Sequence, residues 1–298
     1  MKPRMLRLAC PLISVVLLGC GDSSSAPPLP ASPKVAIPLP SLFEPSSAGT
    51  IRGNIRWSGE LPNVPPFEIR HVVNAWNAPH ARLIRENPNA PQIDIETKSI
   101  ANAVVFLRKV EPRHARPWDH PAVAIEMSHR RLMVAQGNLQ GNLGFVRVGD
   151  SITMVSREEK FNALQSRGAA FFTVPFPDAD KPLTKILNKP GVVELSSGAG
   201  WYWMRGYLHV SDHPYLTRSG PAGDFELSEV PPGKYEIVCW LPNWNIKSQD
   251  RDSETALVTR LFFQPPLEVA REVFVSASGE AHVDFTLDAG MALPTRRK

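Results

Sequence analysis

The chain has 298 residues, of which 43% are hydrophobic and 21% charged, and its formal net charge is +4. This composition excludes an intrinsically disordered chain and suits about two folded domains with apolar cores. Its 30 prolines exceed the average share of about 5% and disfavour long uninterrupted helices.

The N-terminal residues 1–20, MKPRMLRLACPLISVVLLGC, have a basic start and an apolar run from Leu8 to Leu18. The run is too short to span a bilayer comfortably and predicts a removable export signal. Its end, LLGC, resembles the bacterial lipoprotein signal, in which the cysteine is acylated and becomes the mature N-terminus. The resemblance implies removal of residues 1–19 and lipidation of Cys20. An ordinary signal peptide that contains a cysteine is the alternative.

Lipidation implies that the partner is a membrane rather than a nucleic acid. Removal of residues 1–19 lowers the formal net charge of +4 by three charges, to +1, which leaves no basic patch for nucleic acid. Stable anchoring needs more than one acyl chain, and the resemblance implies that Cys20 carries them. Gly21 rather than Asp follows the cysteine. By the sorting pattern of such lipoproteins this favours the outer membrane, with the protein facing the periplasm or the exterior.

Residues 20–48 are rich in Pro and Ser and have no periodic apolar face. They predict a tether extended by up to about 3.1 Å per residue.

From residue 50 onward, short runs with alternating hydrophobicity are separated by turn residues, which predicts an all-β protein. Only residues 157–165 and 253–261 have helical patterns. The predicted strands are 50–57, 103–107, 122–126, 144–148, 151–155, 191–195, 204–210, 224–227, 234–240, 272–275 and 281–287.

The C-terminal part contains GDFELSEVPPGKY at residues 223–235, a strand, a Pro-Pro-Gly turn and a second strand. It resembles the carboxypeptidase regulatory-like domain, a transthyretin-like β-sandwich. The resemblance assigns residues 213–289 to this domain, with an insertion at 239–266. Residues 49–100 supply its opening strand and a loop.

Residues 101–212 resemble a cupredoxin-like Greek-key sandwich. The motifs that carry the resemblance are VGDSITMVSREEKFNAL and GAGWYWMRGYLHV. The fold class expected for the whole chain is therefore all-β, with two sandwiches.

The copper ligands of that family have been replaced. Blue-copper sites use two imidazoles, a thiolate and a weak axial thioether. By the resemblance, the cysteine position holds Gly198, the late histidine position Trp201 and the early one Phe161, next to a retained Asn162, while only Met204 remains. We therefore expect no cofactor and a copper site that has been lost.

Two other histidines are weaker metal candidates. His209 and His213 share a strand parity beside Asp212, but two imidazoles make an incomplete site. His114 and His120 flank Trp118 in a proline-rich loop, where surface histidines are expected.

Aromatic residues raise the question of a ligand surface. If the strand includes them, Trp201 and Trp203 share one face, which suits a core, while an exposed pair would stack on a sugar. Trp240 and Trp244 lie at the insertion, where a long loop on a β scaffold often carries binding. These four tryptophans are the candidate ligand or partner surface.

Enzyme motifs are not supported. The sequence GDS at residues 149–151 resembles an esterase block, but no Asp stands three residues before any later His. Cys239 lies in an apolar strand pattern and predicts a buried thiol rather than a nucleophile. We expect a non-catalytic lipoprotein that serves as a binding or structural module of the cell envelope. Its partner would be an envelope protein or a polysaccharide. The alternatives are a copper electron-transfer protein and a carbohydrate-binding accessory protein.

Overall fold

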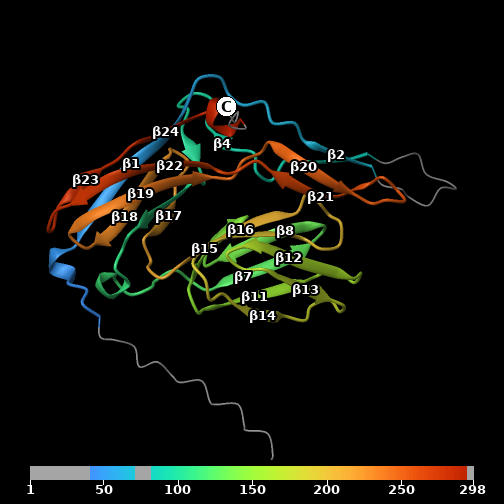
Figure 1. The fold of residues 1–298 in the computed structure, drawn as a ribbon, viewed down its shortest axis with the longest axis horizontal. Coiled ribbons are helices and arrows are strands. Elements are labelled where there is room, and N and C mark those ends of the chain that lie inside the picture. The colour runs from blue at the N-terminus through green and yellow to red at the C-terminus, as the bar shows by residue number, and fades with distance from the viewer. Residues whose placement is uncertain (1–40, 71–81, 294–298) are drawn as a thin grey trace, which may run out of the picture. The chain divides into compact units, whose positions relative to one another are not determined.

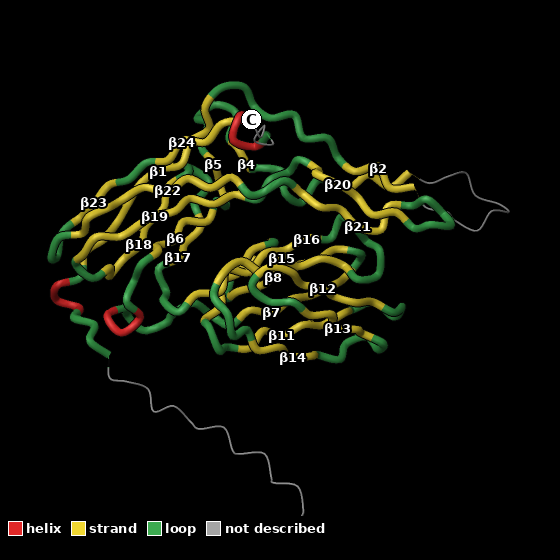
Figure 2. Tube along the Cα trace, viewed as in Figure 1, coloured by secondary structure: helices red, strands yellow, loops and turns green. Residues whose placement is uncertain are grey.

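The protein folds almost entirely into β-strands, which confirms the predicted all-β class. The computed structural model describes residues 41–70 and 82–293, where strands are joined by turns and three short 3-10 segments (Figure 2). None of the helical segments in this described part is long and apolar enough to cross a membrane. Cys20, the predicted signal and most of the tether lie outside the described residues.

The first sandwich consists of two four-stranded sheets that share one core (Figure 1). One sheet has the order β18-β1-β23, with β24 also paired to β1, and the other has the order β17-β6-β19-β22. Their strands are β1 (Gly49–Ser58), β6 (Val104–Arg108), β17 (Leu216–Arg218), β18 (Asp224–Val230), β19 (Gly233–Leu241), β22 (Leu267–Val275), β23 (Glu280–His282) and β24 (Phe285–Asp288).

Alternation along β1 builds the core of this sandwich. Ile51, Ile55 and Trp57 are buried, while Arg52 and Arg56 between them are exposed. Successive side chains of a strand point to opposite faces, so the apolar set faces the second sheet. Each buried side chain of this size stabilises the fold by about 1.5–3 kcal/mol.

The turn that precedes β18 requires the glycine of the GDFELSEVPPGKY motif. Gly223 has a φ of +77°, and a Cβ on it would lie 2.4 Å from the carbonyl oxygen of Ile55. Its own carbonyl accepts a hydrogen bond from the Ile55 N–H at 2.8 Å. Only a residue without a side chain combines this left-handed backbone with this close approach to β1.

The second sandwich consists of two five-stranded sheets with the orders β10-β16-β15-β12-β13 and β14-β11-β7-β8-β9 (Figure 1). Its core joins Ile125 and Met154 of one sheet to Leu164, Leu195 and Leu208 of the other. The strands are β7 (Val123–Ser128), β8 (Arg131–Gln136), β9 (Leu139–Gly141), β10 (Leu143–Arg147), β11 (Ser151–Ser156), β12 (Asn162–Gly168), β13 (Phe172–Phe176), β14 (Leu183–Ile186), β15 (Gly191–Ser197) and β16 (Arg205–Ser211).

A joint between the sandwiches covers the outer face of β16. All seven residues of β16 are buried, so both faces of this strand are covered. The joint is an apolar cluster built from Val104, Leu216 and Trp240 of the first sandwich and Leu143, Phe145 and Tyr207 of the second. Strand β6 belongs to the first sandwich, since it pairs with β17 and β19, although residues 101–212 were expected to form the other domain.

Three two-stranded ribbons complete the described part of the fold. They are β2 (Phe67–Arg70) with β3 (Arg82–Arg85), β4 (Gln92–Ile93) with β5 (Ile100–Ala101), and β20 (Ile246–Arg251) with β21 (Val258–Phe263). The last ribbon lies within the predicted insertion. The helical patterns at 157–165 and 253–261 are wrong, because these residues form turns and parts of β12 and β21.

Candidate functional site

The segment between β15 and β16 is a turn. The Met204 N–H donates to the Trp201 carbonyl at 2.9 Å, and the Tyr202 N–H donates to the Gly200 carbonyl at 2.9 Å. The expected strand alternation from Trp201 to Met204 is therefore wrong, because β16 begins only at Arg205.

The end of this turn is packed into the second sandwich. Trp203 is 7% exposed and Met204 is 1% exposed, and both belong to its core. The Trp203 indole Nε1 donates to the Arg130 carbonyl at 2.8 Å, which satisfies its polar group. Trp201 and Tyr202 are only partly buried against the same core. Met204 is thus buried in the core of the second sandwich.

The other positions matched to copper ligands hold no donor of the required kind. A Cβ on Gly198 would lie 3.0 Å from Ala163 Cβ and 3.1 Å from Gln165 Cγ, so its surroundings are close-packed. Phe161 is 60% exposed and does not fill the interior. The buried Asn162 amide donates to Ser156 Oγ at 3.3 Å. Nowhere in residues 41–70 and 82–293 do three His, Cys, Asp or Glu side chains gather as a metal would need.

His209 and His213 line a cavity of about 430 Å³ at the joint. His209 is 3% exposed, and its ring lies 4.7 Å from the Trp240 ring, measured between centroids. Burial, with a smaller effect of the Arg218 charge, lowers the pKa of His209 to about 3. Its Nε2 has no hydrogen-bond partner among the described residues. Met204 lies in the core of the second sandwich, whereas His209 packs against Trp240 at the joint, so the two do not share a site.

His213 is buried at the start of the link to the first sandwich. Its Nδ1 accepts a hydrogen bond from the Tyr215 N–H at 3.3 Å, and burial lowers the pKa of its imidazole. His120 is half-buried rather than at the surface, with Nε2 2.9 Å from the Pro214 carbonyl oxygen, while His114 is exposed. Burial also lowers the pKa of His120. The lowered pKa values favour the neutral form of His213 and His120 in the folded protein.

The remaining singled-out residues lie in cores. Trp240 is 3% exposed against His209 and Tyr207. Trp244 is 6% exposed, and its ring centroid lies 5.9 Å from that of Trp57. Cys239 is fully buried, and burial raises the pKa of its thiol to about 12. A thiol with such a pKa is not a nucleophile at neutral pH.

An open site lies where the β2–β3 and β20–β21 ribbons meet the turn before β16. Two cavities, of about 370 and 630 Å³, share Glu68, Tyr202 and Val258 in their linings. We call this pair of cavities the ribbon cleft. Trp244 lines the smaller cavity, while Trp201 and Trp203 line the larger one. The cleft thus brings together three of the four tryptophans singled out as a possible ligand surface.

Sequence reasoning missed the charged and phenolic residues of the ribbon cleft. Glu68 comes from β2, in which Phe67 and Ile69 are buried and Glu68 is exposed. This period-2 pattern was available in the sequence, as was the place of Tyr202 between two tryptophans. The approach of Arg251 from the other ribbon was not, because it depends on the packing of segments far apart in the chain.

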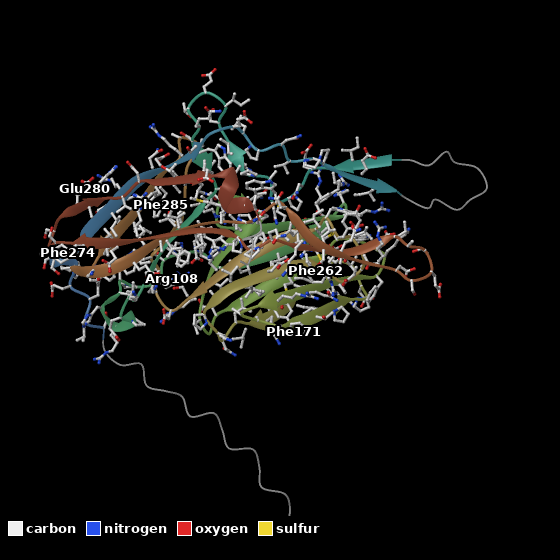
Figure 3. All side chains as sticks on the ribbon, turned by 45° about the horizontal axis from the view of Figure 1, so that its top comes forward. Arg108, Phe171, Phe262, Phe274, Glu280 and Phe285 are labelled. Atoms are coloured by element: carbon white, nitrogen blue, oxygen red, sulfur yellow. The ribbon has the colours of Figure 1, made fainter. Side chains whose placement is uncertain are left out.

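The β20–β21 ribbon is fixed to the second sandwich. The Arg205 guanidinium donates to Glu194 on one side and to the Leu261 carbonyl on the other. On β21, Phe262, labelled in Figure 3, lies under the Arg167 guanidinium at 4.8 Å. One wall of the ribbon cleft is therefore attached to the outer face of the sheet that contains β12, β15 and β16.

No family model and no curated protein matches this chain. Among solved structures, a purple cupredoxin from Nitrosopumilus maritimus is 15% identical and matches 30% of this chain and 99% of its own, with a TM-score of 0.24. A reduced mutant of amicyanin is 14% identical and matches 30% of this chain and 82% of its own, with a TM-score of 0.23. A Cu(I) form of another amicyanin mutant is 13% identical and matches 36% of this chain and 98% of its own, with a TM-score of 0.24.

Proposed function

We propose that this chain is a non-catalytic binding protein of the bacterial cell envelope. In this proposal a cupredoxin-like sandwich that has lost its copper site is joined to a carboxypeptidase regulatory-like sandwich. The observation that supports it is the turn before β16, where Met204 is 1% exposed in the core and where the resemblance matches Gly198 and Trp201 to ligand positions. Copper of the blue type needs two imidazoles and a thiolate, and a lone thioether does not replace them.

The residues now at this place support a structural role for the former site. Trp203 and Met204 are buried in the core, and the Trp203 indole is hydrogen-bonded to the Arg130 carbonyl, which supports a packing role for both side chains. The buried joint supports a rigid pair of sandwiches, since the rings of Trp240 and His209 are buried against each other there. A rigid β scaffold that presents ribbons and loops is a common basis for binding.

The anchoring part of the proposal rests on the sequence. Cys20 would carry acyl chains and the Pro/Ser-rich tether would separate the folded part from the membrane, with the outer membrane favoured.

Copper loading tests the proposal. The mature chain is incubated with Cu(II), and separately with Cu(I) under reducing conditions, then desalted and analysed for metal and for blue absorption. We expect far less than one copper per chain and no blue band. One equivalent of copper retained after desalting, with a thiolate-to-copper absorption, would establish the electron-transfer alternative instead.

A further inference from the structure

The ribbon cleft has the shape of a binding site for an extended small molecule. Its two cavities, about 370 and 630 Å³, each fall within the usual range of about 300–1,000 Å³ for small-molecule sites. They adjoin at Tyr202, whose ring is held edge-on by Phe67 at 5.9 Å and by Trp203 at 5.2 Å, measured between centroids. A ligand that crosses Tyr202 would enter both cavities.

The aromatic part of the lining is fixed but still accessible. Tyr202 and Trp201 are partly exposed, in contrast to the buried Trp203 beside them. Neither the Tyr202 hydroxyl nor the Trp201 indole N–H has a hydrogen-bond partner in the part of the chain that the structure describes. A partly exposed ring with a free polar group combines an apolar face with a hydrogen-bonding edge.

Polar side chains with unused hydrogen-bonding capacity toward the described residues lie around these rings. The exposed Glu68 carboxylate forms no ion pair or hydrogen bond with any described residue. The Arg251 guanidinium is held in place, because Nη1 donates to the Ala256 carbonyl at 2.7 Å and Nη2 donates to the Gln249 side-chain oxygen at 2.8 Å, in the amide orientation that satisfies both side chains. The Gln249 NH2 group is then free to donate to a ligand.

We propose that the ribbon cleft binds a neutral oligosaccharide. Among the residues that the structure describes, Glu68 is the only carboxylate and Arg251 the only cationic side chain that line the two cavities, so this part of the lining has no excess charge that would select an anion or a cation. Sugar rings have C–H faces that stack on aromatic rings and hydroxyl groups that pair with carboxylates, amides and guanidinium groups. This inference rests on the proposed function, because it names the ligand class of a non-catalytic binding protein.

The lining supports binding rather than cleavage. Most glycoside hydrolases need two carboxyl groups, about 5–9.5 Å apart, on either side of the bond that breaks. Glu68 is the one carboxylate that lines either cavity within the described chain. The described part of the lining therefore lacks the second carboxyl group that this mechanism of cleavage needs.

The experiment is a titration of the copper-free mature chain with soluble β-1,4-linked hexasaccharides of glucose, mannose, xylose and N-acetylglucosamine. Isothermal titration calorimetry and tryptophan fluorescence are the readouts. We expect at least one hexasaccharide to bind in the micromolar to millimolar range. Tyr202→Ala and Trp201→Ala should each weaken that binding at least tenfold, and Glu68→Gln about threefold or more.

Controls separate the site from the fold. Glu68 is exposed, so Glu68→Gln should retain the wild-type melting temperature even if Tyr202→Ala does not. Phe274 on β22 is a matched exposed ring, 69% accessible and far from Phe262 and its ribbon in Figure 3, and Phe274→Ala should bind as wild type does. A loss of binding that accompanies Phe274→Ala to the same extent would overturn the assignment to the cleft.

Other outcomes test the two proposals separately. If no hexasaccharide binds, or if binding is unchanged in all three cleft variants, the oligosaccharide proposal is overturned and the proposal of a copper-free binding protein is untouched. If binding depends on the cleft but shorter sugars accumulate, detected by chromatography, the ligand class stands and the non-catalytic function fails.

Discussion

The imidazole of His209 stands edge-on to the indole of Trp240, with ring centroids 4.7 Å apart and an interplanar angle of 84°. His209 lies on β16 of the second sandwich and Trp240 on β19 of the first, so this pair crosses the joint. The Arg218 guanidinium, which donates to the Leu143 carbonyl, is the charged group that opposes protonation of His209. The joint therefore depends on a neutral histidine.

This arrangement predicts a pH-dependent stability. Burial lowers the pKa of His209 to about 3 in the folded state, against about 6.5 in the unfolded state, so the unfolded chain binds the proton more tightly. Above pH 6.5 the protonation of His209 does not lower the free energy of unfolding. As the pH falls from 6.5 towards 3, the free energy of unfolding decreases by up to about 1.4 kcal/mol per pH unit. Urea unfolding between pH 7 and pH 4 measures this slope. His209→Phe should flatten it, and should raise stability at pH 7 by about 1 kcal/mol because an unsatisfied buried nitrogen is removed.

An exposed histidine, His114, provides the matched control for that measurement. His114→Gln should keep the wild-type slope, and the residual slope of His209→Phe should come from His120 and His213, whose pKa values burial also lowers. A His209→Phe variant with the full wild-type slope would show that His209 is protonated without loss of the fold.

A second prediction concerns the position where the family resemblance places a cysteine. A Cβ on Gly198 would approach Ala163 Cβ to 3.0 Å and Gln165 Cγ to 3.1 Å. Gly198→Ala and Gly198→Cys should therefore both destabilise the fold, by about 1–2 kcal/mol, as in other overpacked sites. Thermal unfolding checks both variants. Equal losses would assign the effect to the shared Cβ, whereas wild-type stability in both would show that the turn yields freely.

The strands were predictable where one face is buried and the other is exposed. Ile51, Ile55 and Trp57 alternate with exposed arginines, and the sequence pattern alone locates β1. The pattern failed at residues 253–261, where Val258 and Leu261 have helical spacing. Leu261 is buried instead by the core of the second sandwich, and its carbonyl is bound by Arg205, which is 56 residues away in the chain. Such a long-range contact outweighs local periodicity and leaves no local trace in the sequence.

The candidate sites, too, were only partly predictable from the sequence. Three of the four singled-out tryptophans do meet at one cleft, but Trp203 and Trp244 lie mostly in cores, and only Trp201 is partly open. The cleft itself needs Glu68 and Arg251 on two ribbons that are separated by about 180 residues, and no spacing rule connects them. The joint could not be predicted either. Strand β6 was expected in the second sandwich, but it pairs with β19 of the first.

A third prediction concerns the buried arginine that holds the β20–β21 ribbon. The Arg205 side chain is 3% exposed and paired with Glu194, whose side chain is 35% exposed. Glu194→Gln would leave a buried guanidinium without a counter-charge and should cost about 2 kcal/mol, below the range for fully buried pairs because water reaches the carboxylate. The double variant Arg205→Met/Glu194→Gln should lose less than the two single variants together. Denaturant unfolding of the four proteins gives the coupling energy, and strict additivity would show that the pair contributes nothing.

The last prediction concerns the anchor. If Cys20 is acylated, cells fed a clickable fatty acid should label the wild-type chain and fail to label Cys20→Ala, which should also leave the membrane fraction. A single acyl chain gives only marginal binding, so the wild type should stay with membranes through high-salt washes only if Cys20 carries several chains. By the sorting pattern of the resembled lipoproteins, Gly21→Asp should move the labelled chain from the outer to the inner membrane fraction. Labelling that persists in Cys20→Ala, or a wild-type chain found free of membranes, would favour the ordinary signal peptide, in which Cys20 has no role in anchoring.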